Sequence, residues 1–185
     1  MRARDNPFAV ERLHGLRFRG ADVPAAWGRA ADHRISALVG AQGSGKTTLL
    51  LELAAHARYL GYRTVWIQLR RDARRLTAAH RADLAAIDAL DVVCVDGADL
   101  LPLRDRWFLE RHTRHAVAVI GTLHGPGWMP TLVSLTTSPA LLDEIVGELT
   151  GSSVAAIAGD RGALYARHHG NLRSALRELY DVVGR

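Results

Sequence analysis

Gly40-Ala41-Gln42-Gly43-Ser44-Gly45-Lys46-Thr47 is the segment from which the architecture of this 185-residue chain can be inferred. An apolar run, Ile35 to Val39, comes before it, and Lys46 to Leu60, with leucines and alanines at helical spacing, comes after it. Glycines let the backbone curl tightly, so that successive N–H groups converge, and the N-terminus of a following helix adds positive potential. A strand, this loop and a helix in sequence predict a binding site for a chain of phosphates.

The segment fits the pattern G-x-x-x-x-G-K-[ST] in full. Lys46 is the only lysine in a chain with 24 Lys and Arg residues, and a compact ammonium is what such a loop needs on the β- and γ-phosphates. The Thr47 hydroxyl is the expected Mg²⁺ ligand. A glycine-rich turn before an ordinary helix is the alternative, and the flanking elements argue against it. We therefore expect ATP and Mg²⁺ as ligands, held by Gly40, Ala41, Gln42, Gly43, Ser44, Gly45, Lys46, Thr47 and Thr48.

A second segment, which ends in an acidic residue, supports a metal site. Asp91 to Asp96 reads as an apolar strand that ends in a carboxylate, and Asp96 is expected to hold Mg²⁺ through water, since Mg²⁺ keeps several waters and takes few carboxylates. An aspartate that caps a turn at a strand end is the alternative. Asp99 has two open interpretations: it orients the attacking water as a base, or it caps a helix that begins near Pro102.

Apolar runs alternate with helical patterns, which predicts an α/β fold with a mainly parallel sheet. We expect a lead-in over 1–33, a nucleotide-binding core over 34–138 and a small helical lid over 139–185. The strands are expected at 35–39, 63–69, 92–95, 117–122 and 131–136. The helices are expected at 24–31, 46–60, within 72–90, and at 102–115, 139–149, 160–168 and 171–183.

These motifs resemble the P-loop NTPases that carry an additional strand between Walker A and Walker B, on the AAA+ and STAND side of that division. The resemblance implies a three-layer fold with a parallel sheet of order 5-1-4-3-2. Asp96-Gly97-Ala98-Asp99 resembles the extended Walker B of NACHT ATPases. Gly97 stands where many relatives have a catalytic glutamate, and Leu100 departs from the usual second acid. The resemblance covers about Arg34 to Thr137 well and the lid weakly.

Three further residues follow from the same resemblance. Thr122, at the end of an apolar run, is similar to the sensor 1 residue of AAA+ proteins. His124 resembles more loosely the switch histidine of ABC-type ATPases, with an ordinary turn histidine as the alternative. Arg173, near the start of a helix, resembles the sensor 2 arginine, with a surface arginine as the alternative. The expected catalytic residues are Lys46, Asp99, Thr122 and Arg173.

The expected activity is a Mg²⁺-dependent ATPase or nucleotide-controlled switch, with slow turnover if Asp99 is not the base. A small-molecule kinase is one alternative, although no acceptor-binding segment is evident. A factor that uses ATP to load onto nucleic acid is another. Arginine runs at Arg70 to Arg75 and Arg104 to Arg114, near Trp107 and Phe108, fit that alternative, but also fit a solvated face over core aromatics.

Composition sets the outer limits. The net charge of +5 and pI of about 10.1 suit a polyanionic partner, but an arginine-favouring coding bias explains them as well. No apolar run approaches the roughly 20 residues that cross a bilayer, the start of the chain lacks a secretory signal, and the single Cys94 cannot form an internal disulfide. A cytoplasmic protein without a membrane role is expected, and a protein partner or homo-oligomer stays open.

Overall fold

The computed structural model describes residues 6–8, 18, 21–150 and 160–184. Contacts divide the chain into two compact units. One consists of residues 18–40 and 45–135, and the other of residues 136–185 together with 41–44 and the start of the chain. The functional division into a lead-in, a core and a lid stays a prediction.

A five-stranded sheet forms the centre of the first unit, in the order β2-β3-β4-β1-β5. Its strands are β1 (Ile35–Gly40), β2 (Arg63–Gln68), β3 (Asp91–Asp96), β4 (Ala118–Leu123) and β5 (Thr131–Leu135). Every pairing is parallel, so all the carboxyl ends share one edge. The order 5-1-4-3-2 implied by the resemblance is confirmed.

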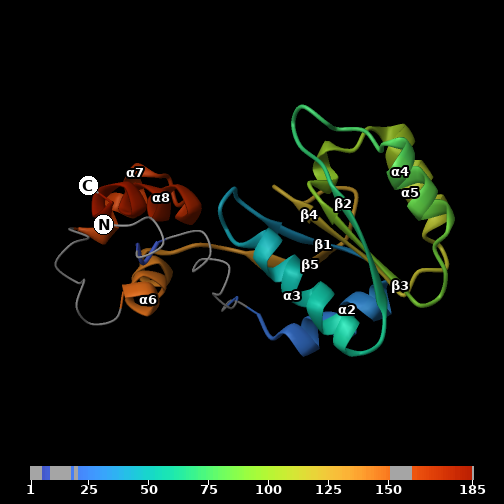
Figure 1. Ribbon diagram of the computed structural model, residues 1–185, viewed down its shortest axis with the longest axis horizontal. Coiled ribbons are helices and arrows are strands. Elements are labelled where there is room, and N and C mark those ends of the chain that lie inside the picture. The colour runs from blue at the N-terminus through green and yellow to red at the C-terminus, as the bar shows by residue number, and fades with distance from the viewer. Residues whose placement is uncertain (1–5, 9–17, 19–20, 151–159, 185) are drawn as a thin grey trace. The chain divides into compact units, whose positions relative to one another are not determined.

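Helices cover both faces of this sheet, which confirms the three-layer arrangement (Figure 1). On one face lie α2 (Val23–His33) and α3 (Lys46–Tyr59), and on the other lie α4 (Ala78–Ala85), the 3₁₀ turn η2 (Ala98–Leu100) and α5 (Leu103–His112). All side chains of β4 are buried, as are those of β3 up to Asp96. Strands covered on both faces read as continuous apolar runs rather than alternating ones.

The region between β2 and β3 shows why only part of 72–90 is helical. Thr77 caps α4 by accepting a hydrogen bond from the His80 N–H, and His80 bonds back to the Thr77 N–H in a capping box. Asp105 of α5, only 3% exposed, accepts hydrogen bonds from Arg81 and from the Leu76 N–H. These contacts fix α4 against α5.

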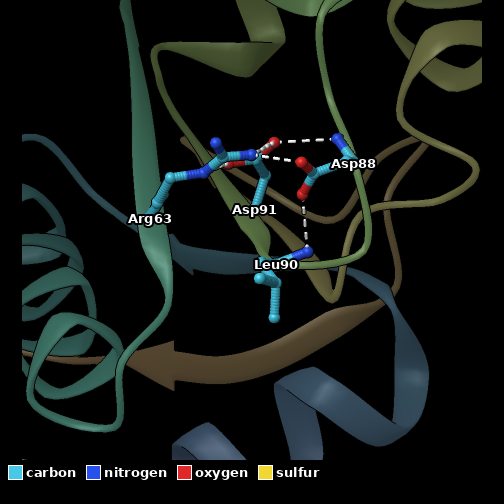
Figure 2. A network of polar contacts seen from close by, with 4 residues as sticks. All are labelled: Arg63, Asp88, Leu90 and Asp91. Carbon is cyan, nitrogen blue, oxygen red and sulfur yellow. Dashed lines mark hydrogen bonds and ion pairs between the residues drawn. The ribbon is translucent and has the colours of Figure 1, made fainter.

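At the amino ends of β2 and β3, opposite the carboxyl edge, an arginine holds two carboxylates (Figure 2). Arg63 donates to Asp91 at 2.9 Å and to Asp88 at 2.5 Å, and these bonds raise the pKa of Arg63. The hydrogen bond from the Leu90 N–H lowers the pKa of the Asp88 carboxyl, and the hydrogen bond from Arg63 lowers it to a smaller extent. The cluster ties the loop before β3 to the start of β2.

The second unit is helical, with α6 (Pro139–Thr150), α7 (Arg161–Arg167) and α8 (Leu172–Val183). Its own apolar core gathers side chains from all three helices and Phe8. Thr137 and Tyr165 share a hydrogen bond at 2.9 Å, and Asn171 caps α8 by accepting from the Ser174 N–H. None of the helices described in either unit is long and apolar enough to cross a bilayer.

Candidate nucleotide-binding site

The glycine loop runs from the end of β1 into α3, as the sequence predicts. Gly45 is the N-cap of α3 in the left-handed conformation, with φ of 89°, and no side chain caps this helix. A Cβ at Gly45 would lie 3.0 Å from the ring of Phe18. A helix start without a side-chain cap leaves backbone N–H groups to be satisfied by a ligand, and its dipole favours an anion.

Two polar side chains of the loop are buried. Lys46 is 8% exposed, and its ammonium donates to the Gly40 carbonyl at 2.7 Å, so the side chain is folded along the loop. Ser44 is 3% exposed, and its hydroxyl has no hydrogen-bond partner among the described residues. Buried polar groups are normally paired, so the Ser44 hydroxyl fits a loop that closes on a phosphate oxygen.

Oxygen ligands suited to Mg²⁺ converge beside the loop. The Thr47 hydroxyl, in the first turn of α3, lies 3.2 and 3.1 Å from the two carboxylate oxygens of Asp96, at the end of β3. Mg²⁺ prefers carboxylate and hydroxyl oxygens together with water. The donor set therefore fits the ion, with Thr47 and Asp96 as the residues that would hold it. No cluster of three or more His, Cys, Asp or Glu side chains suited to a metal occurs in the described part of the chain.

Thr122 ties the metal-side carboxylate to the next strand. Its hydroxyl donates to Asp96 at 2.8 Å and accepts from the Gly97 N–H at 2.8 Å, and the residue is 2% exposed. The register of β3 on β4, which pairs Val95 with Gly121, sets Thr122 beside Asp96. The hydroxyl thus orients the carboxylate, while contact with a γ-phosphate stays a prediction.

Asp99 does not cap the following helix, so that interpretation is wrong. The N-cap of α5 is Pro102, and no side chain caps it. Asp99 instead lies in η2, and its Oδ2 is 2.6 Å from Nδ1 of His124, the residue after β4. His124 is therefore paired with Asp99. Its predicted role toward the nucleotide and the role of Asp99 as base stay predictions.

For the other predicted site residues, the structure gives the element and the exposure of each. Ala41 and Gln42 are exposed, and Thr48 is half-buried in the first turn of α3. Arg173 is exposed in the first turn of α8, in the helical unit, and its phosphate contact stays a prediction. Sequence reasoning singled out Asp99 and His124 separately but missed their pairing. The signal was available, because each follows one of two strands expected to be neighbours in the sheet.

Solved structures of known proteins can now be set beside this geometry. Two single-residue variants of RuvB from Thermotoga maritima superpose on the chain, each with a TM-score of 0.56, at 16% and 17% sequence identity. This chain has the fold of the part of RuvB that it matches. Each superposition covers 85% of this chain and 58% of the RuvB chain, so the chain spans less than two thirds of RuvB. The RuvB likeness supports a P-loop NTPase fold and, at this identity, shows the fold alone.

Two further comparisons find nothing. No family of known proteins matches the sequence, and no curated protein matches it. The assignment of function therefore rests on the site.

Proposed function

We propose that this chain binds ATP with Mg²⁺ and hydrolyses it, acting as an ATPase or nucleotide-controlled switch of the AAA+ and STAND kind. The observation that carries the proposal is the approach of the Thr47 hydroxyl to both oxygens of Asp96, at 3.2 and 3.1 Å. These groups come from the helix after the glycine loop and from β3, and together they would hold Mg²⁺, Thr47 through its hydroxyl and Asp96 through water. Bound there, Mg²⁺ would neutralise charge on the phosphates.

The protein groups have distinct parts in the proposed reaction. The loop N–H groups and Lys46 bind the β- and γ-phosphates. The oxygen of an attacking water bonds to the γ-phosphorus while the bond from phosphorus to the bridging oxygen breaks, and the water's proton passes to Asp99. ADP and phosphate are the products. Arg173 as a phosphate contact, and residues 139–185 as a lid, belong to the same proposal.

The unique lysine allows a direct test of binding. An amine-reactive probe can modify only Lys46 and the chain's amino terminus, and a peptide map separates the two. We expect ATP with Mg²⁺ to protect Lys46 and leave modification of the terminus unchanged. Hydrolysis is then measured as phosphate release in the wild type and in K46A, with the exposed R29A as the control. Lack of protection, or equal phosphate release from K46A, would refute the proposal.

A second candidate function, ATP-dependent binding to nucleic acid, is favoured by the surface of α5. Trp107 is 62% exposed, and the Arg111 guanidinium lies 5.6 Å from its ring centre. Phe108, in contrast, packs against the core. Exposed aromatics stack on bases, and arginines contact the backbone of single strands. Salt-sensitive binding of single-stranded DNA or RNA that W107A weakens would support this function, and binding indifferent to salt and to W107A would exclude it.

A further inference from the structure

Asp99 and His124 meet because their strands are neighbours. β3 and β4 pair in parallel, Asp99 follows the end of β3 by three residues, and His124 directly follows β4. The pair lies beyond the same edge of the sheet as Asp96 and Thr122, and Nδ1 of His124 is 2.6 Å from Oδ2 of Asp99. The imidazole that follows β4 thus contacts the carboxylate that follows the adjacent strand β3.

The two oxygens of Asp99 have different surroundings. Oδ2 is bonded to His124, whereas Oδ1 is buried and has no hydrogen-bond partner among the described residues. Leaving a buried acceptor without a donor costs free energy, and the cost is larger when the acceptor is charged. Oδ2 is therefore the oxygen through which the described residues hold this carboxylate.

The backbone that carries Asp99 is held from several sides. The Gly97 N–H donates to Thr122, and the indole N–H of Trp128 donates to the Ala98 carbonyl at 3.3 Å. A Cβ at Gly121 would lie 2.9 Å from the Cβ of Ala98, so η2 lies close against β4. With the backbone fixed, the remaining freedom of Asp99 is rotation of its side chain, and the bond to His124 removes it.

We propose that His124 is a positioning residue for the base. Its Nδ1–H donates to Oδ2 of Asp99 and fixes the rotation of the carboxylate that receives the proton of the attacking water. This inference rests on the proposed ATPase function and deepens it. His124 makes no covalent bond and transfers no proton in this role; it preorganises the group that receives the proton, as outer residues orient metal ligands and catalytic histidines elsewhere.

A positioning role predicts a specific pattern of kinetic effects. His124 is 53% exposed at its side chain, and exposed ion pairs contribute little to stability, so H124L should unfold at nearly the wild-type temperature. We expect H124L to lower kcat by about 10- to 100-fold, with unchanged KM and unchanged affinity for a nonhydrolysable ATP analogue.

Two amide variants sharpen the test. In H124N the amide nitrogen takes the place of Nδ1 and can donate to Asp99, so kcat should recover most of the loss. In H124Q the amide nitrogen takes the place of Nε2, so kcat should stay low. H115L, at an exposed histidine elsewhere in the same unit, is the control and should match the wild type. Recovery by glutamine and not asparagine would overturn the proposed geometry.

A readout without nucleotide completes the experiment. The ¹⁵N spectrum of the histidine rings should show His124 protonated at Nδ1, and D99N should change that signal while leaving the other ring signals in place. An unprotonated Nδ1, or a signal unaffected by D99N, would overturn the inference. If the wild type hydrolyses ATP and D99N is inactive while H124L keeps the wild-type kcat, the inference fails and the proposed function stands. A wild type without ATP binding or hydrolysis would refute both.

Discussion

Thr122 shows how one hydroxyl organises the carboxyl edge of the sheet. It both donates to Asp96 and accepts from Gly97, so it links the metal-side carboxylate to the turn that carries Asp99. The residue is 2% exposed, and a valine would fill nearly the same volume without either hydrogen bond.

T122V should therefore destabilise the fold by about 1–3 kcal/mol, because the Gly97 N–H loses its acceptor in a buried place. Urea unfolding of the purified variant measures the difference. T122S keeps the hydroxyl and should stay much closer to the wild type. Equal stability of T122V and the wild type would mean that the hydrogen bond from the Gly97 N–H to Thr122 does not contribute to the free energy of unfolding.

The free cysteine gives a second prediction at the same scale. Cys94 lies in β3 with 0% exposure, and burial raises the pKa of its thiol to about 12. Since the thiolate is the reactive species, native protein should resist alkylation at neutral pH and react at once in denaturant. Rapid alkylation of the native protein, timed by mass spectrometry, would contradict the buried position of β3.

At the scale of elements, the turn between β3 and η2 depends on glycine. Gly97 has φ of 84°, and a Cβ there would lie 3.0 Å from the Leu69 carbonyl oxygen. We expect G97A to cost about 1–3 kcal/mol, because a side chain is strained in this backbone region. G28A is the matched control, since Gly28 lies within α2 and a Cβ there would meet nothing within 4 Å.

The control G28A should change the stability of the fold in the opposite direction to G97A. Alanine loses less conformational freedom than glycine when a helix forms, so G28A should stabilise the fold by about 0.5–1 kcal/mol. Chemical denaturation of both variants under one condition gives the comparison. Similar effects from G97A and G28A would show that the left-handed turn is not required.

The amino ends of β2 and β3 predict a pH dependence. The Leu90 N–H and Arg63 lower the pKa of Asp88 in the folded state, so the carboxylate contributes stability above its unfolded pKa of about 3.9, and this contribution is lost as pH falls through the lower folded value. D88N should differ most from the wild type at neutral pH and converge with it in acid. D83N, at an exposed aspartate of α4, should show a smaller difference at neutral pH.

At the scale of the whole molecule, each unit has its own apolar core. The two clusters that flank the sheet consist of side chains from residues 18–135, while the third gathers Phe8 with residues of the C-terminal helices. A truncated chain of residues 18–135 should therefore unfold cooperatively in denaturant. A broad, non-cooperative transition of this fragment would show that the helical unit is needed for the sheet to fold.

Local chemistry is what could be predicted from the amino-acid sequence alone. The glycine loop, the start of α3 at Lys46, the buried β3 and β4, and the α/β class all follow from backbone freedom and apolar patterning over neighbouring residues. Gly45 in its left-handed conformation and the 14-residue helix after it agree with that expectation. The extent of helix within 72–90 was harder to predict from the sequence. Arg81 and the Leu76 N–H of this segment are held by Asp105, which lies outside it.

Only the tertiary structure decided which side chains meet. Thr47 and Asp96 are 49 positions apart in the chain, and Asp99 and His124 are 25 apart. The pairing of Asp99 with His124 depends on the register of β3 on β4, where a slip of one residue turns every side chain to the other face. The pairing of Thr47 with Asp96 joins α3 to β3, which β4 separates from β1 in the sheet. The family resemblance implied that β3 and β4 are neighbours, but register is set by packing on both faces of the sheet, which no short segment of sequence contains.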